Sequence, residues 1–185
     1  MSALLYHTLY DGRRVAFRYT HGTGPCLVFL PGYMSDMSGS KATALFAEAE
    51  EKGRACLLLD YSGCGQSGGD FAEGMLSAWR DEVLALVASY VSGPVLLVGS
   101  SMGGWLMLLI ARMRPDRIVG MVGVAPAPDF TDWGFSQAEK LAPSPDSVTE
   151  ATDSMRGRTR RVSAMATAAS VNAMIRSALG WRSTA

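Results

Sequence analysis

A serine lies at the centre of a short glycine-flanked segment, Gly99-Ser-Ser-Met-Gly103. The segment matches the pattern G-x-S-x-G, in which a serine on a tight turn between a strand and a helix exposes its hydroxyl for attack on a carbonyl carbon. The backbone N–H of the next residue, Met102, would lie at the start of the helix, where it can face a developing oxyanion. The pattern therefore predicts Ser101 as the nucleophile of an acyl-transfer reaction. The alternative is a glycine-rich turn with no chemical role.

Apolar runs on both sides of this turn predict the strand and the helix that would position the serine. The run from Val95 to Val98 has the composition of a buried strand, and the run from Trp105 to Met113 is long enough for a helix. Glycines in the turn let the two elements approach closely and let the serine adopt a positive φ. Strand, turn and helix is the order in which the motif indicates a nucleophile elbow.

The other apolar segments predict an α/β fold. Two strands around Asp11-Gly12 should pair as an antiparallel hairpin. After this hairpin, strands alternate with helices, which predicts a mostly parallel sheet with helices on both faces. The first helix should be capped by Ser38 or Ser40. The predicted strands are 4–10, 14–19, 26–30, 55–59, 95–98 and 118–124, and the predicted helices are about 38–52, 75–91 and 105–114.

Ligands of such sheets bind at the carboxyl ends of the strands. The residues predicted to follow strands at that edge are Pro31, Asp60, Ser101 and Asp129. A loop after Asp60 contains G-x-G-x-x-G between Gly63 and Gly68, but no helix opens immediately after it and the next strand does not end in an acid, as a dinucleotide site would require. No cofactor is therefore predicted. Ser67, in a second G-x-S-x-G, is predicted to be a loop residue or a helix cap.

Composition excludes several classes of partner and site. The 185 residues suggest one domain, and the formal net charge of zero gives no reason to expect a nucleic acid or an anionic membrane as partner. No apolar run approaches the length of a membrane span, and no signal peptide is recognised. The three cysteines lack the spacing of metal ligands and are predicted to be free thiols, so no metal is predicted and a reducing, cytoplasmic location is expected.

Four segments of the sequence together resemble the α/β-hydrolase superfamily. They are Leu30-Pro-Gly-Tyr33, Asp60-Tyr-Ser-Gly-Cys-Gly-Gln-Ser-Gly68, Trp79-Arg80 and Gly99-Ser-Ser-Met-Gly-Gly-Trp-Leu-Met107. Together they are most similar to the subfamily of mitochondrial palmitoyl-protein thioesterase / mycophenolic-acid acyl-glucuronide esterase and its bacterial relatives, and the last segment is quite specific to that group. The resemblance implies an acyl-enzyme on Ser101, with the backbone N–H groups of Tyr33 and Met102 as the oxyanion hole.

The chain departs from this family in the partners of the serine. The triad order in the fold is serine, acid, histidine, yet both histidines, His7 and His21, precede Ser101 and are predicted to be structural or exposed. The family's later strand with Gly-x-x-Asp is absent. Asp129 is a possible acid, because it follows a strand where some members carry theirs. Without a base, however, the rate should fall by several orders of magnitude.

Composition changes after about residue 140. Residues 1–140 are predicted to form an incomplete, truncated α/β-hydrolase core, and residues 141–185 an atypical tail that is irregular or helical. The tail is rich in Arg, Ala, Ser, Thr and Met, which suggests an out-of-frame reading of the gene; a genuine short variant is the alternative. Resequencing the locus would separate the two, because a frameshift requires the missing motifs downstream in another frame.

Three functional hypotheses remain open on the sequence. The first is a serine hydrolase for carboxylic esters or thioesters, with a small-molecule acyl substrate and little or no activity in this chain. The second is a non-catalytic binding protein that keeps the hydrolase cleft, and the third is a truncated gene product. Apolar residues near the predicted cleft could hold an acyl chain or could belong to the core; they are Tyr33, Met34, Met37, Trp105, Phe130, Trp133 and Phe135.

Overall fold

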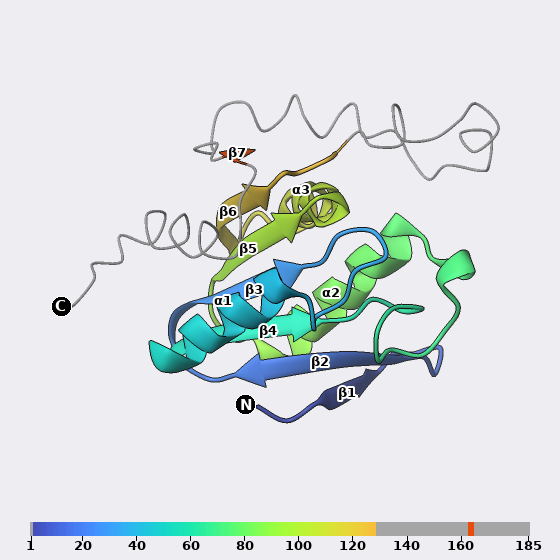
Figure 1. Cartoon of the computed structure of the whole chain (residues 1–185), viewed down its shortest axis with the longest axis horizontal. Coiled ribbons are helices and arrows are strands. Elements are labelled where there is room, and N and C mark those ends of the chain that lie inside the picture. Colours follow the sequence, from blue (N-terminus) through green and yellow to red (C-terminus); the bar gives the residue numbers. More distant parts are fainter. Residues whose placement is uncertain (1, 129–162, 165–185) are drawn as a thin grey trace.

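The computed structural model describes residues 2–128 and 163–164 and contains a twisted sheet flanked by helices (Figure 1). The strands follow the order β1-β2-β4-β3-β5-β6-β7 across the sheet. Among the described strands, β2 runs antiparallel to both of its neighbours, β1 and β4, and the other neighbouring pairs are parallel, so the predicted hairpin and the mostly parallel α/β sheet are confirmed. The strands are β1 Leu5–Thr8, β2 Arg14–Thr20, β3 Thr23–Leu30, β4 Arg54–Leu59, β5 Val95–Ser100, β6 Ile118–Val124 and β7 Ser163–Ala164. The helices are α1 Ser40–Glu51, the short η1 Phe71–Glu73, α2 Leu76–Tyr90 and α3 Met102–Met113.

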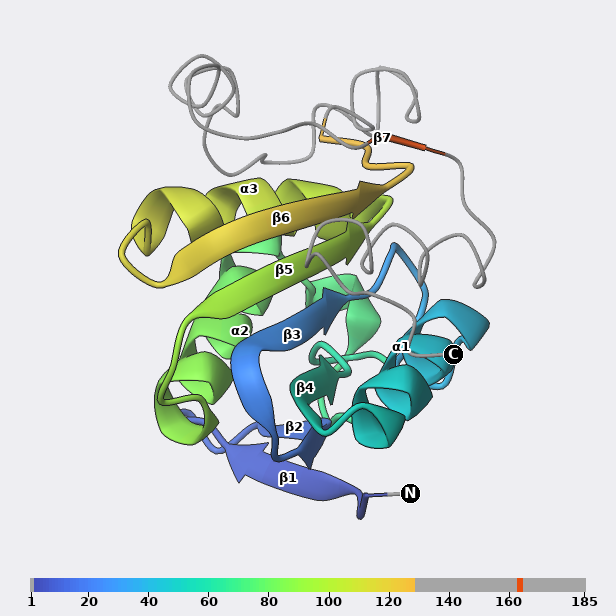
Figure 2. The ribbon, with the colours of Figure 1, turned by 90° about the vertical axis from the view of Figure 1, so that its left-hand side faces the viewer.

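Helices cover both faces of the sheet because the parallel strands are apolar on both sides. In β3, Cys26, Val28 and Leu30 belong to the core cluster that includes residues of α2 and α3. Leu27 and Phe29 point the other way and belong to the cluster that includes residues of α1. Figure 2 shows α1 on one side of the sheet and α2 and α3 on the other. Successive side chains of a strand point to opposite faces of the sheet, and both faces are covered here. Every position of the strand is therefore apolar, which explains the uninterrupted apolar run in the sequence.

The strand order places Ser101 at the end of an interior strand of the sheet. Strand β5 lies between β3 and β6, with Leu30 opposite Gly99 and Val124 opposite Ser100. Ser101 therefore follows β5 at the carboxyl edge, with the loops after β3 and β6 on either side of it. This is the edge at which ligands bind open α/β sheets.

The predicted serine cap of α1 is wrong. Gly39 occupies the capping position without a side-chain hydrogen bond, and Ser40 is the first residue of the helix. The Ser38 hydroxyl and backbone N–H instead donate to the carboxylate of Asp36. A charged acceptor two residues away forms a stronger bond than a helix amide and so draws the serine out of the capping role.

A buried carboxylate ties α2 to the opening hairpin. Glu82 in α2 is 1% exposed and accepts hydrogen bonds from the backbone N–H and hydroxyl of Ser62. Arg13, in the hairpin turn, donates to the same carboxylate at 2.9 Å and to Asp11 at 2.7 Å. Burial raises the pKa of Glu82, and the bonds from Ser62 and Arg13 oppose that rise. Arg13 thus supplies the counter-charge for a carboxylate that water does not reach.

Replacing Arg13 with alanine should destabilise the protein more at pH 7 than near pH 5. A carboxyl whose pKa is higher in the folded chain than in the unfolded chain makes stability fall as the pH rises between the two values, and loss of Arg13 widens that interval. We expect a loss of about 2 kcal/mol at pH 7, less than for a fully enclosed pair because the Arg13 side chain is 36% exposed. Urea unfolding at the two pH values measures the difference.

Arg114→Ala is the control for this experiment. Arg114 pairs with Asp116, but both side chains are exposed. Its removal should leave the free energy of unfolding almost unchanged at either pH, because solvent screens an exposed pair. An equal loss of stability at pH 5 and pH 7 in Arg13→Ala would show that Glu82 does not depend on Arg13 for its charge.

Candidate active site

Ser101 adopts a backbone conformation that non-glycine residues rarely occupy. Its φ is 51° and its ψ is −118°, at the junction of β5 and α3. Such a conformation costs about 1–3 kcal/mol and persists only where the surroundings hold it. Here the Ser101 N–H donates to the carbonyl of Val124, and the Ser101 carbonyl accepts from the N–H groups of Gly104 and Ala127. The side chain is exposed and makes no capping bond to the helix, so its hydroxyl faces outward.

Glycines beside Ser101 allow backbone segments to touch. A Cβ at Gly103 would lie 2.0 Å from the carbonyl oxygen of Leu30, and one at Gly99 would lie 2.4 Å from that of Gly103. The first turn of α3 therefore rests directly on the end of β3. This contact sets the distance between the strand that carries the serine and the loop that follows β3.

The structure brings together three of the four residues predicted for the site. Met102 is the first residue of α3 and follows Ser101 directly. Tyr33 follows Gly32, where a Cβ would lie 3.3 Å from the Cβ of Ser101. A turn, in which Ser35 N–H donates to the Gly32 carbonyl, holds this loop beside the serine. The fourth residue, Asp129, lies outside the described residues.

A row of aromatic rings runs from the core to the loop that carries Tyr33, and the sequence patterns did not predict it. The ring of Tyr33 meets Phe71 edge-on at 5.2 Å, Phe71 stacks on Trp79 at 5.7 Å, and Trp79 stacks on Tyr61 at 5.4 Å. The Tyr61 hydroxyl donates to the carbonyl of Pro31. The aromatic row therefore packs against the loop after β3 on its inner side, whereas Tyr33 itself is 44% exposed. The sequence signal that could have indicated this row is the presence of aromatic residues in the glycine-rich loop and in α2.

The apolar residues predicted near the cleft separate into two groups. Met37 and Trp105 are each 4% exposed and belong to the core. Tyr33 and Met34 are exposed at the surface of the loop after β3. Phe130, Trp133 and Phe135 lie outside the described residues.

The glycine-rich loop after β4 folds around a carboxylate of its own chain. The side chain of Asp60 is buried and accepts a hydrogen bond from the N–H of Gln66 at 2.8 Å. Ser67 is a loop residue, as predicted, whose hydroxyl donates to the Asp60 carbonyl and accepts from the N–H of Ala16. After the glycines the chain forms the three-residue turn η1, capped by Asp70, rather than an α-helix.

Both histidines lie away from Ser101. His7 is in the edge strand β1, where its ring contacts Tyr90. Four strand spacings, roughly 19 Å, separate β1 from β5 in the sheet. His21 follows β2 at the amino edge of the parallel strands and packs edge-on against Tyr19. The prediction that neither histidine belongs to the site is consistent with these positions.

The three cysteines are buried free thiols. Burial raises the pKa of Cys26 to about 12 and that of Cys64 to about 11, so both are protonated at neutral pH. Within residues 2–128, no group of three or more histidine, cysteine, aspartate or glutamate side chains is arranged to hold a metal ion. None of the helices described here combines the length and apolar character needed to cross a membrane.

Known proteins are similar to this chain over most of its length. Human mitochondrial palmitoyl-protein thioesterase ABHD10 is 43% identical over 127 residues, which are 69% of this chain but 42% of that protein. Its mouse counterpart, alpha/beta hydrolase domain-containing protein 10, superposes with a TM-score of 0.69 at 34% identity, over 75% of this chain and 57% of that structure. A protein from Agrobacterium vitis S4 superposes with a TM-score of 0.64 at 32% identity, over 90% of this chain and 65% of that structure. The chain thus spans about two fifths of the length of its curated relative.

The expected cytoplasmic location is contradicted by these relatives. The curated relatives from human, orangutan, rat, cow and mouse are all named as mitochondrial proteins. The expectation rested on buried free thiols, and a thiol reports only that its surroundings are reducing. It does not distinguish one reducing compartment from another.

The model of the alpha/beta hydrolase family matches residues 27–184, which include the residues after 140 that the composition set apart. The resemblance of the glycine–serine segment to this group is confirmed by the similarity to ABHD10. Sheet order, helix placement and the turn at Ser101 agree with the same assignment. This chain belongs to the alpha/beta hydrolase family.

Proposed function

We propose that this protein is a serine hydrolase that acts on carboxylic esters or thioesters, with Ser101 as the nucleophile. The observation that carries the proposal is the conformation of Ser101, whose positive φ turns an exposed hydroxyl out from the carboxyl edge of the sheet. The thioesterase names of its relatives support the same class of substrate. An acyl group attacked by Ser101 would form an acyl-enzyme that water then hydrolyses.

In this proposal the backbone N–H groups of Met102 and Tyr33 stabilise the oxyanion. Met102 begins α3, where the helix dipole adds to the field of the amide. Tyr33 lies on the loop whose Gly32 approaches the side chain of Ser101. Because each donor is a backbone group, this role does not fix the identity of the side chains at positions 33 and 102. No cofactor takes part in such a reaction.

We further propose that turnover is slow in this chain, because neither imidazole lies near Ser101. A serine without a general base loses several orders of magnitude in kcat, although the oxyanion hole still accelerates the reaction. The same observation favours a second candidate function, in which the protein binds acyl compounds without hydrolysing them.

A fluorophosphonate probe tests the proposal, since an oxyanion hole accelerates its reaction with the adjacent serine even where the lack of a base makes the labelling slow. Folded protein is incubated with the probe and digested, and the adduct is located by mass spectrometry. We expect the adduct on Ser101, with none on heat-unfolded protein treated in the same way. Hydrolysis of p-nitrophenyl acetate and of a small acyl thioester then measures turnover. A folded protein that shows no adduct after prolonged incubation would contradict the hydrolase proposal and support the binding protein.

A further inference from the structure

We propose that Asp60 is a positioning residue, whose carboxylate joins the loop carrying Tyr33 to the glycine-rich loop after β4. The carboxylate binds one backbone N–H from each loop and so holds the Tyr33 amide in place beside Ser101. This inference rests on the proposed function, because it assigns a purpose to the oxyanion loop. Amide exchange and probe labelling, measured separately, distinguish its failure from that of the hydrolase reaction.

The contacts of Asp60 are specific and enclosed. Its side chain is 1% exposed. One carboxylate oxygen accepts from the N–H of Met37 at 2.7 Å, and the other accepts from the N–H of Gln66 at 2.8 Å. The backbone of Asp60 is itself anchored, since its N–H donates to the Ala16 carbonyl at 2.9 Å. Asp60 is thus fixed at the end of β4, and each of its carboxylate oxygens accepts a hydrogen bond from a different loop, one after β3 and one after β4.

Gly65 makes room for this carboxylate. A Cβ at Gly65 would lie 2.1 Å from one carboxylate oxygen of Asp60 and 2.4 Å from its carboxyl carbon. Gly65 also has a φ of 51°, which an L side chain rarely adopts. The glycines that resemble a nucleotide-binding pattern therefore wrap an internal carboxylate. Any side chain at position 65 would clash with the carboxylate of Asp60.

The charge of Asp60 is held mainly by backbone amides. Burial raises its pKa, and the N–H groups of Gln66 and Met37 oppose that rise. Asp36 and Arg18 act on it with opposite signs. A carboxylate held in this way costs stability relative to a neutral side chain. In return, the carboxylate forms two charge-assisted hydrogen bonds, one to the N–H of Met37 and one to that of Gln66.

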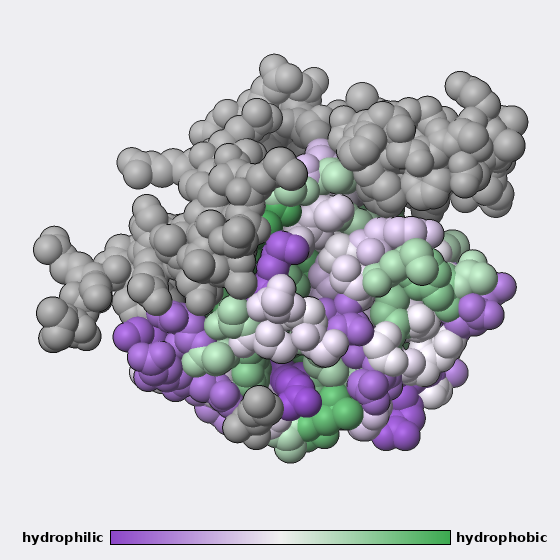
Figure 3. Space-filling model, viewed as in Figure 1, coloured by the Kyte–Doolittle hydropathy of each residue, from purple (hydrophilic) through white to green (hydrophobic). Residues whose placement is uncertain are grey.

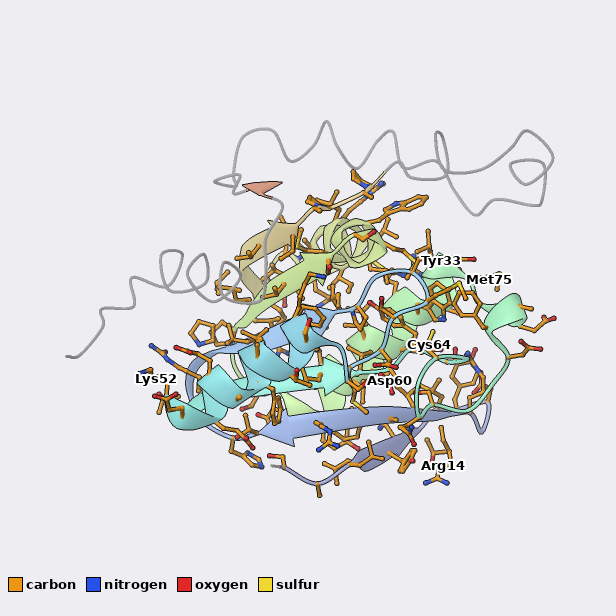
Figure 4. All side chains as sticks on the ribbon, in the orientation of Figure 1. Arg14, Tyr33, Lys52, Asp60, Cys64 and Met75 are labelled. Carbon is orange, nitrogen blue, oxygen red and sulfur yellow. The ribbon has the colours of Figure 1, made fainter. Side chains whose placement is uncertain are left out.

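The bond to Met37 secures a loop that packing leaves open on one side. A cavity of about 430 Å³ borders Asp36, Met37 and Asp60, and it extends toward α1 and Arg18. Figure 3 shows polar and apolar residues mixed on the face of the molecule that carries α1. Figure 4 shows Asp60 and Cys64 close together, with Tyr33 farther up in the view. Next to Tyr33, Met34 has a φ of 53° and is 75% exposed, so this stretch needs anchors on both sides.

Amide exchange measures the clamp without any reaction at Ser101. Asp60→Asn keeps the shape of the side chain, but its NH₂ group must face one of the two N–H donors, so one bond is lost. We expect amides in residues 31–37 or 61–69, and chiefly those of Met37 or Gln66, to exchange about 10- to 100-fold faster, as for loss of a charged hydrogen bond. Amides of residues 95–113 should be unaffected. Unchanged exchange in both loops would overturn the proposal.

Glu82→Gln is the matched control. Glu82 is as buried as Asp60 and also accepts from a backbone N–H, that of Ser62. Its replacement should speed exchange near Ser62 and leave residues 31–37 as they are. If Glu82→Gln loosens residues 31–37 as much as Asp60→Asn does, the effect is general destabilisation and the assignment of Asp60 fails.

Two further measurements keep the test decisive. Where Asp60→Asn does not fold, the wild-type protein still serves: the amides of Met37 and Gln66 should both be protected, and exchange of Met37 at the rate of an open loop would overturn the proposal. Where the variant folds, its rate of fluorophosphonate labelling per folded molecule should fall about 10- to 100-fold, as for a displaced oxyanion donor. Altered exchange with unaltered labelling would refute a role at Ser101.

If the wild-type protein is not labelled at all, the hydrolase proposal fails and amide exchange alone decides whether Asp60 holds the loop.

Discussion

Replacing Ser101 with glycine is expected to stabilise the protein and, at the same time, to abolish its reaction with serine-directed probes. Ser101 has a φ of 51° and a ψ of −118°, a combination that glycine adopts freely. Relief of about 1–3 kcal/mol of backbone strain exceeds the roughly 0.5–1 kcal/mol that glycine loses through its more flexible unfolded chain. A net gain of about 1 kcal/mol raises Tm by about 2–4 °C in a domain of this size.

Ser101→Ala is the control that separates strain from chemistry. Alanine also lacks the hydroxyl, so it too should give no adduct with the probe. It retains a Cβ, however, and with it the strain, so its Tm should stay near that of the wild-type protein. Thermal unfolding by circular dichroism and mass spectrometry of the labelled protein measure the two effects. An adduct that persists in either variant, or a glycine variant less stable than the alanine variant, would contradict this account of Ser101.

Gly103→Ala is expected to cost about 3 kcal/mol of stability or more, although alanine favours helices. In an exposed helix the change would gain about 1 kcal/mol. Here the added Cβ would lie 2.0 Å from the carbonyl oxygen of Leu30 and 2.7 Å from that of Pro31. Both contacts are with backbone at the end of β3, which cannot turn aside as a flexible side chain can. The clash therefore outweighs the helix propensity, and α3 must move away from the sheet.

The displacement should also weaken the site, because Pro31 leads directly into the loop of Gly32 and Tyr33. We expect labelling of Ser101 in the folded variant to slow by about 100-fold, as for a shift of about 1 Å in a reacting group. Gly93→Ala serves as control, since no atom lies within 4 Å of its added Cβ. Its stability should change by no more than about 0.5 kcal/mol. Urea unfolding measures the free energy of unfolding of Gly103→Ala and of Gly93→Ala. Equal stability of the two variants would mean that α3 does not pack against the end of β3 in solution.

The sheet and the serine turn were predictable because their signals are local. Strands β3, β4, β5 and β6 each contain an apolar run of strand length, and α2 begins and ends within one residue of its predicted limits. The glycines around Ser101 report a steric demand of the turn itself. The cap of α1 was predicted wrongly, because the choice between Ser38 and Gly39 depends on where the carboxylate of Asp36 points.

The bonds that hold the site together were not predictable, since they join residues far apart in the chain. Asp60 binds an amide 23 residues before it, and Glu82 binds Arg13 across 69 residues. No periodicity or motif records such a pairing. The aromatic row from Tyr61 to Tyr33 has the same character, because it depends on α2 packing beneath the loop after β3.

Residue types and their spacing were enough to establish the class of fold, the position of Ser101 on a strand-to-helix turn and the absence of a histidine after it. These features belong to short segments, in which covalent geometry and local sterics are sufficient. The folded chain was needed to show that His7 and His21 lie away from Ser101, that the glycine-rich loop encloses Asp60, and that Gly32 lies against the serine. The reason is physical: burial, and contact between distant segments, exist only once the strands have assembled in their order across the sheet.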